Sequence, residues 1–111
     1  MEITGKIENN IGKLYLDGRF DANTAEKVEK AIKTVISKGT YRIILDLSKV
    51  PFIASAGLRV VLASAKLLRQ TYKGDLRIAA LQPGPEKVFE ISGLNNVLKL
   101  FPTVENASKN F

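Results

Sequence analysis

The sequence predicts a single α/β domain in which about four helices pack on a mixed sheet of four or five strands that opens with an N-terminal hairpin. The 111 residues are enough for one compact domain and too few for two ordinary ones. Segments typical of strands alternate with segments typical of amphipathic helices, a pattern of layered α/β proteins. The strand predicted over residues 42–46 is apolar without alternation, which indicates a central strand covered on both faces. We therefore expect residues 1–111 to form one domain without a linker or an internal repeat.

The first forty residues predict a hairpin and then a helix. Residues 3–7 and 11–16 have the composition of two short strands. Asn23 and Glu26 have the spacing of a capping box, so a helix is expected to begin near them and to end at Gly39. Its apolar face is formed by residues at helical spacing, namely Ala25, Val28, Ile32, Val35 and Ile36.

The middle of the chain predicts a strand–helix–strand unit. After the strand at 42–46, a loop over residues 52–58 leads into a helix that is expected to end at Gly74. A further strand is predicted over residues 76–81. A unit of this length implies a parallel pair of strands with a right-handed crossover.

The last thirty residues predict shorter elements. Residues 83–85 are expected to be loop, with Pro85 in the first turn of a third helix that closes at residues 92–93. Residues 98–101 predict a last short strand and residues 103–107 a terminal helix, whose tail we expect to fray.

The residue types that the chain lacks exclude several kinds of chemistry. There is no cysteine and no histidine. Disulfides, thiolate zinc sites, cysteine nucleophiles and Ser-His-Asp triads are therefore excluded. Only Asp, Glu, Lys and Tyr remain for acid–base chemistry, and the sequence offers no identifiable pair among them. We expect no enzymatic activity, no cofactor and no metal site.

The charge and the ends of the chain indicate its surroundings. A formal net charge of +6 suggests nucleic-acid binding, but the cations are spread over predicted helix surfaces and no binding motif accompanies them. We expect no direct contact with nucleic acid. The first residues lack a secretion signal and no apolar segment has membrane-spanning length, so we expect a soluble, cytoplasmic protein.

The loop over residues 52–58 presents one hydroxyl, that of Ser55. Ser55 is expected at or beside a helix N-terminus, where the first amides have no internal partners and carry partial positive charge. An anion attached there would be stabilised, so a phosphoryl group on Ser55 is physically plausible. On spacing alone the simpler alternative is favoured, in which Ser55 is an N-cap worth about 1 kcal/mol.

Four segments, taken together in their order and spacing, carry a family resemblance. They are Gly18-Arg19-Phe20-Asp21 followed by Thr24-Ala25-Glu26, Ile44-Leu45-Asp46-Leu47-Ser48 with Val50, Ile53-Ala54-Ser55-Ala56-Gly57-Leu58, and Val88-Phe89-Glu90-Ile91-Ser92-Gly93-Leu94. Over essentially its full length the chain resembles the STAS domain family and, within it, the stand-alone bacterial anti-sigma factor antagonists.

The resemblance implies a regulatory binding protein. In the family, the dephosphorylated antagonist binds an anti-sigma factor that is also a serine kinase and so frees the sigma factor. The kinase switches the antagonist off by phosphorylating a loop serine, which Ser55 matches, and a PP2C-type phosphatase restores binding. The implied partners are therefore this kinase and this phosphatase, and we expect the free chain to be a monomer.

The expected contact surface joins the loop before the first helix to the Ser55 loop, because loops at one edge of a sheet cluster together. Asp21 is the second candidate after Ser55 itself. The full set is Asp21, Asn23, Thr24, Ile53, Ala54, Ser55, Ala56, Gly57, Leu58 and Arg59.

The chain departs from the family pattern at three positions. Many relatives have Asp-Ser-Ser or Asp-Ser-Thr before the glycine, whereas Ala54 and Ala56 flank the serine here. Arg59 stands where many relatives have a small residue, and this cation could pair with a phosphate on Ser55 or point to solvent. An alternative function remains open, that of a non-phosphorylated STAS scaffold or ligand-sensing module in a signalling complex.

Overall fold

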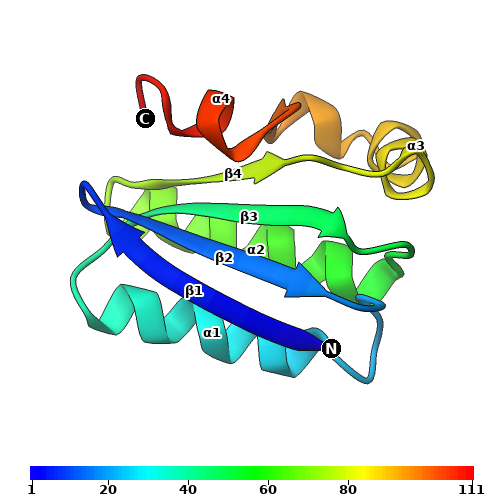
Figure 1. The fold of residues 1–111 in the computed structure, drawn as a ribbon, viewed down its shortest axis with the longest axis horizontal. Helices are drawn as coiled ribbons and strands as arrows, with labels where there is room; N and C mark the ends of the chain where they lie inside the picture. The colour runs from blue at the N-terminus through cyan, green and yellow to red at the C-terminus, as the bar shows by residue number, and fades with distance from the viewer.

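A computed structural model, which describes residues 1–111, places five strands in one sheet in the order β1-β2-β3-β4-β5 (Figure 1). The strands β1 and β2 pair antiparallel, and every other neighbouring pair is parallel. The strands are β1 (Glu2–Glu8), β2 (Ile11–Asp17), β3 (Arg42–Lys49), β4 (Asp75–Ala79) and β5 (Lys99–Phe101). This confirms the predicted mixed sheet with an N-terminal hairpin and a central third strand.

Helices cover the two faces of the sheet unequally. One face packs against three helices, α1 (Ala25–Ser37), α2 (Ser55–Thr71) and α3 (Pro83–Ile91). The other face packs against α4 (Val104–Ser108) alone (Figure 1). A short 3₁₀ turn, η1 (Leu94–Asn96), joins α3 to β5. None of the helices combines the length and the apolar character needed to cross a membrane.

The central strand shows why its sequence does not alternate. Ile43 and Leu45 belong to the main core under the three longer helices, whereas Ile44 packs in a smaller cluster under α4. All three side chains have no exposed surface. The strand is therefore buried on both faces, as its uninterrupted apolar run predicts.

The turn between β1 and β2 and the C-terminal end of α1 both follow from local backbone chemistry. Asn9 and Asn10 join β1 to β2 with φ of 52° and 62°, the left-handed values that a two-residue hairpin turn requires. At the end of α1, Gly39 has φ of 81°, and its amide donates to the carbonyl of Ile36 at 2.9 Å. The amide of Thr40 donates to Val35 at 3.4 Å, which completes a Schellman motif and confirms the predicted helix end.

The predicted capping box at Asn23 and Glu26 is wrong. The N-cap of α1 is Thr24, one residue later, and no side chain accepts a hydrogen bond from the first-turn amides. The Thr24 hydroxyl instead donates to the carbonyl of Arg19 at 2.8 Å and accepts from the amide of Asp21 at 3.0 Å. The cap position is thus occupied by a side chain that already holds the preceding turn together.

Several predicted boundaries are also wrong. The strand predicted over residues 76–81 ends at Ala79, and the loop predicted over residues 52–58 is shorter because α2 already begins at Ser55. The strand predicted over 42–46 continues to Lys49, and the segment 83–85, predicted as loop, is the first turn of α3. A helix can begin with Pro-Gly-Pro because its first amides have no intrahelical partner, so the missing N–H groups cost nothing there.

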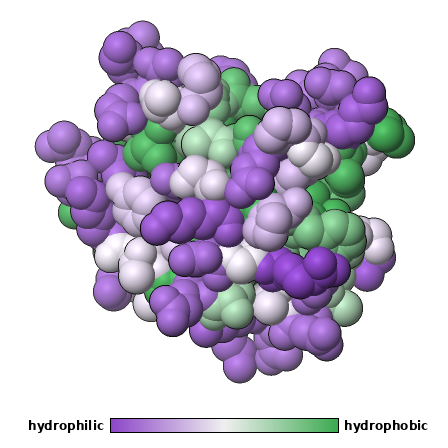
Figure 2. Space-filling model, turned by 45° about the vertical axis from the view of Figure 1, so that its right-hand side comes forward, coloured by the Kyte–Doolittle hydropathy of each residue, from purple (hydrophilic) through white to green (hydrophobic).

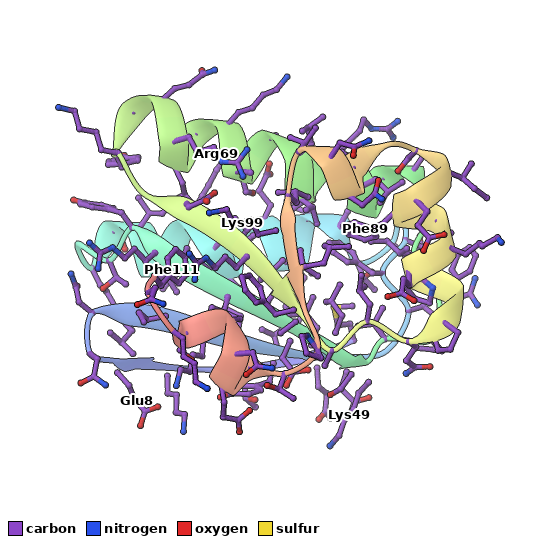
Figure 3. All side chains as sticks on the ribbon, turned by 90° about the horizontal axis from the view of Figure 1, so that it is seen from above. Glu8, Lys49, Arg69, Phe89, Lys99 and Phe111 are labelled. Atoms are coloured by element: carbon purple, nitrogen blue, oxygen red, sulfur yellow. The ribbon has the colours of Figure 1, made fainter.

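The C-terminal tail is held in place, so the expectation that it frays is wrong. Arg77 on β4 is 7% exposed, and its Nη1 donates to the carbonyls of Ala107 at 2.9 Å and Lys109 at 3.0 Å. Its Nη2 donates to Asn110 at 3.2 Å. The guanidinium carbon lies 4.2 Å from the ring centroid of Phe111, which is labelled in Figure 3. One buried cation therefore ties the tail to the sheet.

Candidate functional site

The candidate site lies where two loops meet at the carboxyl end of β3, to the right in Figure 1. The amide of Phe20, after β2, donates to the carbonyl of Phe52 at 2.9 Å, and the amide of Ala54 donates back to Phe20 at 2.9 Å. These bonds form a parallel bridge between Phe20 and Ile53. The loop before α1 and the loop before α2 are thereby fixed side by side.

Gly57 allows the first turn of α2 to lie directly on this bridge. A Cβ at Gly57 would stand 2.9 Å from both Cδ1 and the carbonyl oxygen of Phe20, and 3.0 Å from Cγ1 of Ile53. Phe20 and Ile53 are both buried. Any side chain at Gly57 would push the helix start away from the bridge, so this glycine sets the position of Ser55.

Ser55 is the first residue of α2 and its side chain is exposed. The N-cap is Ala54, with an extended backbone (φ −107°, ψ 175°), and no side chain accepts a hydrogen bond from the first-turn amides. The interpretation of Ser55 as an N-cap is therefore wrong. Its hydroxyl stands one position past the cap and is not used to close the helix.

The first amides of α2 are only partly satisfied. The amides of Gly57 and Leu58 donate to the carbonyl of Ala54 at 2.9 Å and 3.1 Å. The amides of Ser55 and Ala56 have no backbone partner. Two open donors thus accompany the exposed hydroxyl at the positive end of a 17-residue helix.

The charged groups around this helix start are sparse. The first turn of α2 contains no acidic residue. Arg59, one turn further along, is exposed and forms no ion pair. With no carboxylate in this turn to oppose it, an anion placed at Ser55 would meet open amides and a free cation on the same helix.

The neighbouring turn before α1 is braced from within. The carboxylate of Asp21 accepts from the amide of Asn23 at 3.0 Å, and its Oδ2 lies 3.4 Å from Nε of Arg19. Together with the two hydrogen bonds of Thr24, these contacts fix the shape of the turn. The side chains of Asp21 and Thr24 are thus engaged locally, while Asn23 is exposed.

The structure brings the ten predicted contact residues to one end of the molecule but divides them by exposure. Asn23, Ser55 and Arg59 are exposed, and five more are partly exposed: Asp21, Thr24, Ala54, Ala56 and Leu58. Ile53 and Gly57 are buried, so the expectation that they lie on the contact surface is wrong. They support the surface from below.

Sequence reasoning missed one pair on this surface. Phe52 is 40% exposed, and the guanidinium of Arg19 lies 4.2 Å from its ring centroid. Apolar surface also shows in patches between hydrophilic residues on the face that Figure 2 turns forward. No local signal pairs these two residues, because the Phe20 bridge that brings them together joins segments more than thirty residues apart.

Comparisons with known proteins agree with this geometry. The STAS domain family model matches residues 2–107. BtrV of Bordetella bronchiseptica, named a candidate anti-sigma factor antagonist, is 42% identical over 91 residues, which cover 82% of this chain and 75% of BtrV. RsfB of Mycobacterium tuberculosis, an anti-sigma-F factor antagonist, is 28% identical over 105 residues, or 95% of this chain and 84% of RsfB.

A similar fold is found in the Bacillus cell fate determinant SpoIIAA, solved in its phosphorylated form. The TM-score is 0.72 at 25% identity, and the match covers 96% of each chain.

Proposed function

The chain belongs to the STAS domain family, and on that premise we propose that it is an anti-sigma factor antagonist whose binding surface is switched off by phosphorylation of Ser55. The observation that carries this proposal is the state of the α2 N-terminus. Ser55 is exposed, its hydroxyl does not cap the helix, and two amides beside it are open. The names of BtrV and RsfB support the antagonist role, and the phosphorylated form of SpoIIAA supports the switch.

The two loops and the start of α2 contribute three charged side chains to the surface around Ser55 in the unmodified state. They are Arg19 and Asp21, which pair with each other, and the exposed Arg59. The anti-sigma factor, itself a serine kinase, docks on this surface and releases its sigma factor. The kinase then transfers the γ-phosphoryl group of ATP to Oγ of Ser55. An Oγ–P bond forms, the bond between the γ-phosphorus and the bridging oxygen of ADP breaks, and the hydroxyl proton leaves to a base of the kinase.

The phosphorylated protein stays folded. A phosphate adds roughly −1.5 to −2 charges at neutral pH, and a helix N-terminus stabilises such a charge. The amides of Ser55 and Ala56 are within the same turn, and Arg59 supplies a cation on the next. No change of backbone conformation is needed to accommodate the group.

The same phosphate prevents docking. Charge and bulk brought without compensation into an interface cost on the order of several kcal/mol. A penalty of roughly 3 to 4 kcal/mol weakens binding several-hundred-fold. A PP2C-type phosphatase restores the surface by hydrolysing the phosphoester bond, which returns the hydroxyl of Ser55 and releases inorganic phosphate.

The experiment compares the binding of three variants to an anti-sigma factor of the serine kinase type by titration calorimetry, with radiolabelled ATP to follow phosphate transfer. Ser55→Ala should bind as the unmodified protein does and accept no phosphate. Ser55→Asp should bind at least about tenfold more weakly, because one charge reproduces part of the phosphate penalty. Ser37→Asp, at the exposed C-terminal end of α1, is the control and should bind normally.

Equal affinity of Ser55→Ala and Ser55→Asp would contradict the switch. Normal binding without any phosphate transfer to Ser55 would favour the alternative of a non-phosphorylated scaffold.

A further inference from the structure

A groove runs between the edge strand β1 and helix α1, away from the Ser55 surface. β1 is the first strand of the sheet and pairs only with β2, so the backbone groups on its outer side have no partner strand. Alternate residues of a strand point to the same face, and Ile3, Gly5 and Ile7 of β1 all line the groove. Figure 1 shows β1 as the dark blue strand at the edge of the sheet, with α1 next to it.

The opposite wall of the groove is one stripe of α1. Its residues follow each other at intervals of four, three and four, which places them on a single helix face. They are Lys27, Ala31 and Thr34 of α1 and Lys38, the C-cap of this helix. The groove between the strand and this stripe has a volume of about 590 Å³.

The groove combines an apolar floor with positively charged ends. Ile7 is 42% exposed, and Leu14 covers Gly5 in the middle of the strand, with its Cδ2 2.8 Å from where a Cβ of Gly5 would lie. No carboxylate lines the groove. Lys27 and Lys38 form no ion pair, and Nζ of Lys27 donates to the carbonyl of Met1 at 2.6 Å, which holds the ammonium group without neutralising it.

We propose that this groove binds an extended acidic segment of a partner protein, which adds to the sheet as a sixth strand beside β1. Main-chain hydrogen bonds to the free edge supply affinity, and alternate side chains supply specificity. Apolar side chains of the segment cover Ile3 and Ile7, and carboxylates near its two ends pair with Lys27 and Lys38. This docking site is independent of Ser55 and of its phosphorylation.

A second copy of the chain fits this edge poorly. If two copies of β1 paired antiparallel about Gly5, the central residue of the strand, Glu2 of each copy would face Glu8 of the other. Like charges directly opposite each other destabilise a strand pair, and both copies also carry a net charge of +6. An acidic partner avoids both obstacles when its carboxylates lie on the groove face with Ile3 and Ile7, because Glu2 and Glu8 point to the other face of β1.

The test uses a synthetic peptide blocked at both ends, with the order Glu-Thr-Val-Glu-Val-Thr-Glu. In a strand, the two valines and the terminal glutamates share one face, and the terminal glutamates lie about 20 Å apart. Lys27 and Lys38 are separated by about 16 Å along the helix axis, so both carboxylates can reach an ammonium group. Binding is measured by fluorescence anisotropy, and ¹H–¹⁵N spectra of the protein locate the site.

We expect the peptide to shift the amide signals of β1, and we expect Lys27→Glu combined with Lys38→Glu to weaken binding about tenfold. Lys66→Glu combined with Lys87→Glu, an equal charge change on the exposed surfaces of α2 and α3, should leave binding unchanged. A peptide methylated on alternate backbone nitrogens should lose binding, because it keeps its charge but not its main-chain donors. If the double variant does not fold, a peptide with lysine in place of glutamate tests the same charge pairing on the unmodified protein.

Three results would overturn the proposal. The peptide could fail to bind, or it could bind equally well after methylation, which would exclude strand addition. Laurate, an anionic single-chain lipid, could displace the peptide and shift the same signals at lower concentration, which would make the groove a lipid site.

Discussion

The N-terminus of α4 is capped by a side chain, whereas the N-terminus of α2 is open. At α4 the hydroxyl of Thr103 accepts a hydrogen bond from the amide of Asn106 at 3.0 Å. At α2 the N-cap is Ala54, which has no side-chain acceptor, and two amides stay open. A helix of five residues is marginal without help from caps and packing, whereas one of 17 residues packed on a sheet tolerates an open end. The open end of α2 therefore leaves capacity for an anion that α4 does not have.

The largest expected effect comes from releasing α4. Arg77→Met removes hydrogen bonds to three carbonyl groups and a buried cation stacked against Phe111, so we expect the free energy of unfolding to fall by about 3 kcal/mol. Urea denaturation measures this change, and hydrogen exchange should show faster exchange in α4. Arg59→Met makes the same substitution on the exposed surface of α2 and should change stability by less than about 0.5 kcal/mol. Equal effects of the two variants would contradict the comparison.

The next effect concerns the junction beneath Ser55. Gly57→Ala places a Cβ 2.9 Å from the carbonyl oxygen of Phe20, and we expect a loss of about 1 to 2 kcal/mol although alanine favours helices. Lys66→Ala, at an exposed position of the same helix, is the control because it also introduces alanine but adds no atom near the Phe20–Ile53 bridge. Thermal unfolding of both variants tests the difference. A more stable Gly57→Ala protein would show that the junction is not closely packed.

The positions of β3, α2 and the first hairpin turn could be predicted from the sequence because their signals are local. The apolar run of β3, the helical spacing in α2 and the asparagine turn at residues 9–10 each depend on neighbours in the sequence. The segment 53–58 identified the loop of Ser55, and its place at a helix N-terminus followed from the glycine and the apolar period after it.

The remaining features depend on contacts that the sequence does not display. Arg77 holds the tail through backbone carbonyls, which every residue possesses, so no side-chain pattern marks the contact. The Phe20–Ile53 bridge joins distant loops and decides that Gly57 is buried. Ala54 occupies the N-cap although alanine is a poor cap, and this is why propensity alone pointed to Ser55.

Substitutions at the two N-cap residues, Thr103 and Ala54, test the comparison of α4 with α2 through smaller changes in stability. Thr103→Ala should cost about 1 kcal/mol of stability, because α4 loses its side-chain acceptor. Ala54→Ser should add up to about 1 kcal/mol, because Ala54 already has the extended backbone of a cap residue and the serine oxygen can accept from an open first-turn amide. Chemical denaturation of the two variants gives both values. No gain from Ala54→Ser would mean that the first-turn amides are already satisfied.

The smallest expected effect on stability concerns Glu8, at the end of the sheet opposite the Ser55 surface. Figure 3 labels Glu8 far from Lys49, the last residue of β3. Hydrogen bonds from Lys13, at 3.0 Å, and then from Lys6 lower the pKa of Glu8 below its ordinary value of 4.5. A lowered pKa in the folded state stabilises the protein above the unfolded pKa, and this contribution disappears as the pH falls through the folded pKa.

We therefore expect Glu8→Gln to be slightly less stable than the unmodified protein at about pH 7, and we expect this difference to be smaller at about pH 3. Melting temperatures at the two pH values, with and without about 1 M salt, measure the difference, which salt should abolish because the pair is exposed. A difference that is equally large at low pH would assign the effect of Glu8 to packing of the hairpin end. In that case the hairpin, like the C-terminal tail that Arg77 holds, would be stabilised by contacts that do not titrate. The Ser55 surface would then be the one region of the molecule whose binding is governed by added charge.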